Sequence, residues 1–269
     1  MSSGVRKLVV NADDFGFTRD VNQGIVEAHR NGILTATTLM AAGAFDPAAF
    51  DDAVRLARET PTLDIGCHLV LVGAAPFPLT VAQLVRAVAL QQIRIYDELS
   101  AQVRRVLDAG IRPTHLDTHK HTHLLPPVLD AVARISEEFK IPWVRRPFDF
   151  PFTPEGISAA KRAVTKAMTV VRKRSLRVLA EHGCRSTDHF AGFQITGRYD
   201  AGGLVKLLRA LPEGSTELMT HPGKLGASLR NAPTRLKESR EQELRALTAP
   251  EVRACLGERG IQLCGYRDL

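Results

Sequence analysis

Short runs of apolar, mostly β-branched residues alternate along the chain with longer segments in which apolar residues recur at helical spacing. The short runs predict strands at residues 8–11, 36–41, 65–71, 114–118, 143–145, 190–193, 217–220 and 262–266. The helical patterns between them include residues 22–31, 46–59, 81–109, 126–139, 157–181 and 204–211. Strands that alternate with helices favour βαβ units and a parallel sheet.

The number of these units indicates how the sheet closes. Seven or eight βα units are typical of a closed or nearly closed barrel rather than an open doubly wound sheet. The sequence has no internal repeat, low-complexity tract or Gly/Ser-rich linker, and 269 residues fit one α/β barrel. We therefore expect an α/β fold with a single domain over residues 1–269.

Titratable residues gather where the predicted strands end. Asp13 and Asp14 follow the apolar run LVVNA, His68 lies inside DIGCHLVL, and His221 follows ELMT. Histidines end PTHLDTHKH, and arginines end the strand that runs into VRRPFD. Because the carboxyl ends of parallel strands meet on one face of an α/β barrel, we expect a single site there.

The stretch HLDTHKHTH, residues 115–123, holds four of the nine histidines and Asp117. Alternate side chains of an extended segment point to the same face. We expect the chain to leave the strand near His119, so that not all five alternate residues share one site. A single HxH pair would more often be a hydrogen-bonded loop. Four histidines and an aspartate after a buried strand favour a divalent metal, with carboxylates that fix the imidazole tautomers.

Asp13 and Asp14 are adjacent carboxylates whose side chains diverge in an extended backbone, so one could bind a metal while the other acts as a base. The alternative is a turn with an Asp N-cap, because DDFGFTRD contains a glycine and precedes a helix. His68, with apolar neighbours on both sides, needs a buried partner. A metal shared by Asp14, His68 and His119 would supply that partner and leave positions open for water and substrate.

Two weaker candidates follow later strands. Arg145 and Arg146 lie together in WVRRPFDF, where one of them can hold a carboxylate with paired hydrogen bonds. His221, before Pro-Gly, is a candidate general acid or only a turn residue.

The motifs NADDFG, GCHLVL and PTHLDTHKHTHLLP, in this order, closely resemble the YdjC-like carbohydrate deacetylase family. That family includes chitooligosaccharide deacetylases and hopanoid-associated deacetylases. The likeness extends from Val9 to the C-terminal GIQLCGYRDL. It implies a distorted (β/α) barrel similar to polysaccharide deacetylases, and a metal site formed by Asp14, His68 and His119.

The resemblance also implies a reaction, the metal-assisted removal of an N-acetyl group from an amino sugar in an oligosaccharide or a glycolipid. By a looser likeness to polysaccharide deacetylases, Asp13 would be the general base, Arg146 its orienting arginine and His221 the general acid. The cofactor would be one divalent cation, with Mg²⁺ and Zn²⁺ as the first candidates. The remaining polar residues near the motifs are expected to support the metal or the substrate: Asp117, His121, His123 and Asp188.

The net charge of +7 is concentrated in one segment. Between Gly156 and Ala180 there are seven Lys or Arg residues and no Asp or Glu, and apolar residues in residues 157–181 follow helical spacing. The simpler interpretation is a helix that packs on the barrel and exposes a solvated basic face. The other is attraction of this helix to an anionic membrane or a lipid-linked substrate.

Two further function classes fit parts of the sequence. A metal-dependent phosphoesterase would also use clustered His and Asp residues, but it needs bridging carboxylates, and few are present beyond Asp14 and Asp117. A nucleic-acid-binding protein would fit the pI near 9.5, but it leaves the histidine array unexplained, and aromatic residues are only 6% of the chain.

The sequence lacks the features of an exported or membrane-spanning protein. No apolar run approaches the roughly 18–20 residues that span a bilayer, and the N-terminal stretch has no apolar signal core. The four cysteines show no CxxC spacing, which favours reduced thiols: Cys67, Cys184, Cys255 and Cys264. We expect a cytoplasmic protein, peripheral at the inner membrane if the basic helix binds lipid, and leave homodimer formation open.

Overall fold

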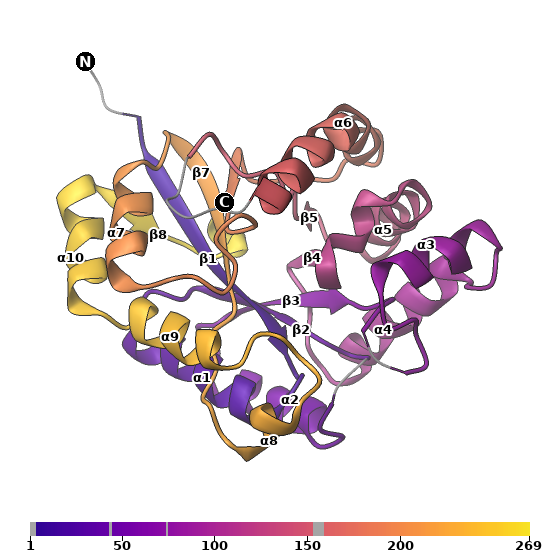
Figure 1. Cartoon of the computed structure of the whole chain (residues 1–269), viewed down its shortest axis with the longest axis horizontal. Helices are drawn as coiled ribbons and strands as arrows, with labels where there is room; N and C mark the ends of the chain where they lie inside the picture. The colour runs from indigo at the N-terminus through magenta and orange to yellow at the C-terminus, as the bar shows by residue number, and fades with distance from the viewer. Residues whose placement is uncertain (1–3, 43–44, 74, 153–158) are drawn as a thin grey trace.

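The computed structural model describes residues 4–42, 45–73, 75–152 and 159–269, and Figure 1 shows a curled parallel sheet surrounded by helices. The strands follow the order β5-β4-β3-β2-β1-β7-β6, and β8 pairs with β1 beside β2. All pairs are parallel. The strand bounds are β1 (Arg6–Phe15), β2 (Ala36–Leu39), β3 (Asp64–Leu69), β4 (His115–Thr118), β5 (Trp143–Val144), β6 (His189–Ala191), β7 (Gly214–Thr220) and β8 (Ile261–Leu263).

Strand β1 is the centre of the sheet. Its residues from Leu8 to Phe15 are all buried, because neighbouring strands flank both edges and side chains cover both faces. A parallel strand covered on both faces reads as a continuous apolar run rather than an alternating one. The run LVVNA therefore predicted the buried strand at the centre of the sheet.

The sheet curls into a barrel that closes incompletely between β5 and β6. In the described residues, only isolated bridges join the two edges, pairing Trp143 with Arg185 and Asp149 with Phe190. The amide of Val144 donates a hydrogen bond to the carbonyl of Arg185 at 2.8 Å. The expectation of a distorted (β/α) barrel is confirmed.

The helices cover the outer face of the sheet (Figure 1). Amphipathic stripes pack against the strands; on α1, for example, Val21 and Ile25 are fully buried, and the Thr18 side chain caps the first turn. The bounds are α1 (Arg19–Asn31), α2 (Ala49–Glu59), α3 (Val81–Ala89), α4 (Ile95–Asp108), α5 (Pro126–Phe139), α6 (Ala159–Glu181), α7 (Ala201–Arg209), α8 (Ala227–Asn231), α9 (Glu238–Leu247) and α10 (Pro250–Arg259), with 3₁₀ helices η1 (His119–Leu124) and η2 (Tyr266–Asp268).

One predicted helix is divided. The pattern over residues 81–109 forms two helices, α3 and α4, because the chain turns between Leu90 and Arg94. Gln91 has a φ of +54° there, in the left-handed region that ends a right-handed helix. The sequence has no Gly or Pro at this break, so the helical spacing of apolar residues predicted one continuous helix.

The barrel interior is polar, whereas the apolar core lies between the sheet and the helices. Charged side chains that are almost fully buried point into the barrel from several strands, among them Asp13, Asp117, Arg145 and Glu217. Within the described residues, no helix is both long and apolar enough to cross a membrane.

Candidate metal centre and active site

Asp14 lies one residue before the end of strand β1, at a break in the strand's pairing with β2. The register between β1 and β2 shifts between Ala12 and Phe15, and Asp14 has a φ of +71°. Left-handed backbone is uncommon for residues other than glycine, and aspartate is one of the few that adopt it. The kink interrupts the strand's alternation, so Asp13 and Asp14 both line the same cavity although they are neighbours.

Asp14, His68 and His119 point one donor atom each at a common centre. Asp14 Oδ1 lies 3.3 Å from His68 Nε2 and 3.3 Å from His119 Nδ1, and the two nitrogens are 3.2 Å apart. Ligand bonds of about 2.0–2.2 Å at tetrahedral angles place donor atoms about 3.3–3.6 Å from each other. The three side chains therefore have the spacing of ligands to one small divalent cation.

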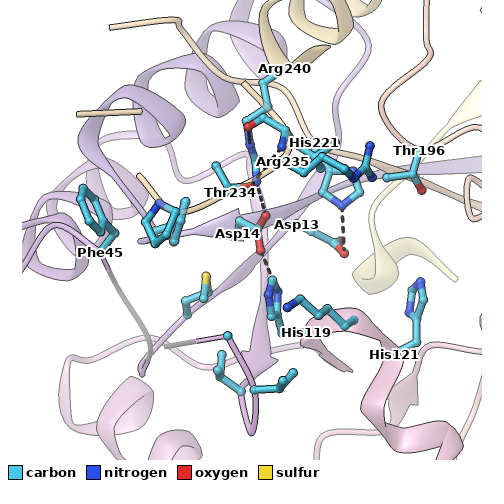
Figure 2. Close-up of a pocket in the computed structure, with 18 of the residues that line it drawn as sticks. Asp13, Asp14, Phe45, His119, His121, Thr196, His221, Thr234, Arg235 and Arg240 are labelled. Carbon is cyan, nitrogen blue, oxygen red and sulfur yellow. Dashed lines mark hydrogen bonds and ion pairs between the residues drawn. The ribbon is translucent and has the colours of Figure 1, made fainter. Parts of the chain in front are cut away.

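An unsatisfied oxygen supports this assignment. Asp14 Oδ1 is buried and accepts no hydrogen bond of good geometry among the described residues, its nearest polar neighbours being the two histidine nitrogens at 3.3 Å. A buried carboxylate oxygen without a partner is costly, and native structures pair such atoms with protein, water or an ion. Figure 2 shows Asp14 between His119 and Arg240, with one oxygen toward each. The residues present thus fit a cation on the Oδ1 side.

His68 is oriented by Asp117. Its Nδ1 lies 2.7 Å from Asp117 Oδ1, which leaves Nε2 to face Asp14 and His119. The other oxygen of Asp117 accepts a hydrogen bond from the Thr38 hydroxyl at 3.2 Å. Burial opposes the charged imidazolium, but the surrounding carboxylates outweigh it and raise the pKa of His68 to about 10. The centre therefore favours positive charge.

Arg240, from α9, holds the other oxygen of Asp14. Its guanidinium hydrogen-bonds to Asp14 Oδ2, and both side chains are buried. Burial would raise the pKa of Asp14, but Arg240 and the two histidines hold it well below its usual range. Asp14 is anionic, with Oδ2 held by arginine and Oδ1 available.

Asp13 is paired with Arg145, not with Arg146. Arg145 donates to the two oxygens of Asp13 at 2.6 and 2.8 Å, and Asn11 adds a third hydrogen bond at 3.1 Å. The guanidinium outweighs the effect of burial and lowers the pKa of Asp13. Arg145 also contacts Asp117 and Glu217, each at 2.6 Å. The buried guanidinium of Arg145 therefore forms ion pairs with three carboxylates.

The expectations for Arg146 and Asp188 are corrected by their positions. Arg146 turns outward and donates to the backbone carbonyl of Asp188. Asp188 accepts hydrogen bonds from Ser215 at 2.8 and 2.7 Å, near the amino-terminal end of β7. Neither residue lines the cavity that contains Asp14. We therefore replace Arg146 by Arg145 as the arginine that contacts Asp13.

His221 follows β7 beside Asp13. Its Nε2 lies 3.8 Å from Asp13 Oδ2 (Figure 2), and its backbone amide donates to Glu243 at 2.6 Å. Burial lowers the pKa of His221 to about 4, although Asp13 favours the charged form. Burial also raises the pKa of Glu243 to about 7, against the hydrogen bonds that it accepts. His221 is therefore neutral near pH 7.

The remaining histidines of HLDTHKHTH separate, because the chain leaves β4 after Thr118. Lys120 and His121 are both left-handed, with φ of +53° and +52°, which breaks the extended alternation. His121 lines the cavity next to Phe193, while His123 Nδ1 lies 2.6 Å from the Thr118 hydroxyl. His115 stacks on Tyr266, with ring centroids 3.9 Å apart.

A cavity of about 650 Å³ is lined by Asp14 and His119, two of the three candidate ligands, and by Asp13 and His221. Aromatic and aliphatic side chains form much of its wall, and Lys120 and Arg235 add positive charge. Its other lining residues include Phe17, Met40, Phe45, Val70, Val72, Phe193, Thr196, Met219 and Leu236. This volume is in the range of small-molecule sites.

Comparison with known proteins places this geometry in a family. A family model described as YdjC-like protein matches residues 7–258. The chain belongs to the YdjC-like family. Proteins named carbohydrate deacetylase are 33% identical in Brevibacillus brevis (strain 47 / JCM 6285 / NBRC 100599) and 31% in Geobacillus stearothermophilus. The first alignment covers 98% of this chain and 99% of the relative, and the second covers 98% of each.

A solved structure agrees with this membership. The crystal structure of an Enterococcus faecalis V583 protein, named for cellobiose-phosphate cleavage, superposes with a TM-score of 0.72. It is 26% identical, and the match covers 98% of each chain. The barrel of this YdjC-like chain is thus similar to an experimental structure over nearly its full length.

Several residues of the YdjC-like site escaped the sequence reasoning. Arg240 and Glu243 lie on α9, one turn apart, and reach Asp14 and the amide of His221. Glu217 lies inside β7, four residues before His221. A glutamate within an apolar strand is rarely buried without a partner, so the sequence alone could have marked it as a site residue. No local pattern distinguishes Arg240 from the other arginines of a charged helix.

The described residues also contain a second group that could hold a metal ion, Asp13 with His68 and Asp117. Arg145 already bonds both of these carboxylates, and Asp117 holds His68 through a hydrogen bond. The charge of both carboxylates is thus already balanced by a buried guanidinium, which a second cation would have to displace. The two-metal arrangement of a phosphoesterase is therefore disfavoured.

Proposed function

We propose that this YdjC-like protein hydrolyses the N-acetyl group of an acetylated amino sugar, with one divalent cation held by Asp14, His68 and His119. The observation that carries the proposal is the mutual spacing of 3.2–3.3 Å between their three donor atoms. The full-length relatives named carbohydrate deacetylase support the reaction class.

A divalent cation supplies Lewis acidity, which polarises an amide carbonyl and eases the deprotonation of water. The chain's own part begins at Asp13, which would accept a proton from the attacking water. Arg145 fixes this carboxylate with two hydrogen bonds and keeps it ionised. Positioning of this kind matters as much as basicity, because the base must lie within hydrogen-bond reach of water.

His221 would deliver a proton to the amine nitrogen as the carbon–nitrogen bond breaks. An amine leaves poorly without this proton. Since the pKa of His221 is about 4, the resting imidazole is neutral and has to receive a proton during the reaction. Asp13, with its Oδ2 at 3.8 Å from Nε2, is the group placed to pass on the proton taken from water. The products are acetate and the free amino sugar.

The cavity suits a sugar substrate in size and lining. Its volume of about 650 Å³ leaves room for more than the acetyl group, and the rings of Phe17, Phe45 and Phe193 offer apolar surface to a sugar ring. The substrate is either an N-acetylated oligosaccharide or a glycolipid such as a hopanoid-linked N-acetylglucosamine. The cytoplasmic location stays a prediction from the sequence.

Acetate release tests the proposal. Purified protein, loaded with Mg²⁺ or with Zn²⁺, would be incubated with diacetylchitobiose and with an N-acetylglucosaminyl lipid in detergent. We expect acetate from at least one substrate, loss of release with a chelator, and recovery when the cation is restored. Asp14→Ala and His68→Ala serve as inactive controls.

Two competing activities are measured with the same preparations. Cleavage of p-nitrophenyl phosphate would indicate a phosphoesterase, and salt-sensitive binding of duplex DNA would indicate a nucleic-acid-binding protein. Phosphate ester cleavage without acetate release, lost in Asp14→Ala, would overturn the deacetylase assignment while keeping the metal site.

A further inference from the structure

Helix α6 carries a basic surface that the proposed reaction does not use. It contacts α5 and η1 and lies on the outside of the barrel, at the top of Figure 1. Its packed side is formed by Met168, Ser175, Val178 and Leu179, all of which are buried. These positions recur at helical spacing, so the opposite side of the helix faces solvent.

The solvent side forms a continuous stripe, which we call the α6 stripe. Its members recur at intervals of three or four residues and are all exposed: Ala163, Lys166, Val170, Lys173, Arg174 and Arg177, with Arg162 beside them. Val170 is 81% exposed, more than any other large apolar side chain in the described residues. Cations therefore surround an apolar side chain that nothing covers.

Few carboxylates balance these charges. Arg174 lies 3.3 Å from Asp130 and Arg177 lies 3.7 Å from Glu181, and both pairs are solvent-exposed. Exposed pairs of this kind are weak and exchange readily with other anions. Within the described part of the chain, no ion pair involves Arg162 or Lys173. The stripe thus keeps a net positive field at its surface.

We propose that the α6 stripe docks the protein on a membrane surface that contains anionic lipids. A basic stripe alone would attract any polyanion. The exposed Val170 at its centre favours a partner with an apolar layer behind an anionic surface, which a bilayer provides and a nucleic acid does not. Because α6 packs against η1, which carries His119 and His121, docking would bring the membrane near the candidate site.

Vesicle flotation tests this proposal without any measurement of catalysis. The full chain would be mixed with vesicles of phosphatidylcholine alone, or of phosphatidylcholine with phosphatidylglycerol, at low and high salt. We expect flotation only with the anionic vesicles, and weaker flotation at high salt. Equal binding to both kinds of vesicle, or binding that salt leaves unchanged, would overturn the proposal.

Matched variants locate the contact. Arg162→Glu and Lys173→Glu should each weaken partitioning by roughly an order of magnitude, because each reversal removes one attraction and adds one repulsion. Arg86→Glu makes the same charge change on the exposed surface of α3 and should leave binding unchanged. An equal loss in Arg86→Glu would show that net charge, not the stripe, drives binding.

The apolar component has its own pair of variants. Val170→Ser should reduce the flotation that remains at high salt, whereas Val85→Ser, at a 44% exposed position on α3, should not. Far-UV circular dichroism and urea unfolding confirm that each variant is folded. Salt-sensitive binding of duplex DNA through the stripe, with no flotation, would replace the membrane by a nucleic acid. The proposal stands or falls independently of deacetylation, since none of these variants touches the candidate site.

Discussion

Arg145 and Asp13 are joined by two hydrogen bonds, of 2.6 and 2.8 Å, across the interior of the barrel. The two residues are 132 positions apart, at the ends of β5 and β1. Arg145 is 2% exposed and also contacts Asp117 and Glu217, so it connects Asp13 with the carboxylate that orients His68. The candidate base and the candidate metal ligands therefore share one buried network.

Replacing Asp13 by Asn should separate chemistry from metal binding. The three candidate metal ligands are Asp14, His68 and His119, so Asp13→Asn should still bind the cation. Turnover should fall by about 10²–10⁴-fold, the usual contribution of a general base. Metal content by elemental analysis and acetate release by enzymatic assay measure the two effects. Full turnover in Asp13→Asn would show that another group accepts the proton.

Asp117→Asn should weaken the cation without removing a ligand. The substitution leaves His68 without its carboxylate partner at Nδ1, so the imidazole is less firmly oriented and less basic. Loss of such a partner typically lowers metal affinity about 10–100-fold. Competition with a chromophoric chelator measures this affinity. Asp188→Asn, at a carboxylate outside the cavity, is the matched control and should bind metal normally.

Arg145→Lys and Arg146→Lys test which arginine belongs to the network. Lysine cannot reproduce the paired hydrogen bonds to Asp13, so buried carboxylate oxygens would lose hydrogen-bond donors. Hydrogen bonds to charged groups contribute about 1.5–3 kcal/mol each, so the loss of one or more of them should lower the free energy of unfolding of Arg145→Lys by about that amount. Arg146 is only partly buried and bonds to a backbone carbonyl, and its variant should stay within about 0.5 kcal/mol of the parent. Urea unfolding of both proteins decides between them.

Asp14→Ala should lose the metal and also destabilise the metal-free protein. Arg240 is buried against Asp14 Oδ2, and removal of the carboxylate leaves an uncompensated buried guanidinium. The expected cost is about 3–5 kcal/mol of unfolding free energy. Asp14→Ala/Arg240→Met, which removes both charges, should recover much of this stability but none of the metal binding. A double variant as unstable as Asp14→Ala would show that the ion pair is not the source of the loss.

The stability of the metal-free protein should depend on His221 at mildly acidic pH. Its folded pKa of about 4 lies below the unfolded value near 6.5. The unfolded chain therefore binds a proton first, and this residue lowers stability as pH falls from about 6.5 to about 4. His221→Gln should make the pH dependence shallower by up to about 1.4 kcal/mol per pH unit in that window.

Glu243 acts in the opposite direction over part of the same range. Its folded pKa of about 7 lies above its ordinary value of 4.5, so the folded protein holds the extra proton between those values. Glu243 therefore adds stability as pH falls through that range. Urea unfolding of His221→Gln and Glu243→Gln at several pH values separates the two contributions. Identical pH profiles for His221→Gln and the parent would contradict the burial of a neutral imidazole at this position.

The alternation of apolar runs and helical patterns determined most of the fold. Each predicted strand is present within a few residues, because parallel strands covered on both faces require continuous apolar runs such as Leu8–Val10. The division between α3 and α4 was not predictable, since Gln91 adopts its left-handed backbone without a Gly or Pro signal. The barrel's incomplete closure also depends on contacts between segments far apart in the chain.

The residue types at the strand ends were enough to identify the candidate metal ligands. In the structure, the donor atoms of Asp14, His68 and His119 lie within 3.3 Å of each other. Only the tertiary structure decided between Arg145 and Arg146, because neighbouring residues at a strand end point to opposite sides and the sequence does not state which side faces the barrel. Only the tertiary structure brought Arg240 to Asp14, across 226 positions. Chemistry that depends on one residue type at a strand end is visible in the sequence. A partner supplied by a distant helix is selected by packing, which no local pattern records.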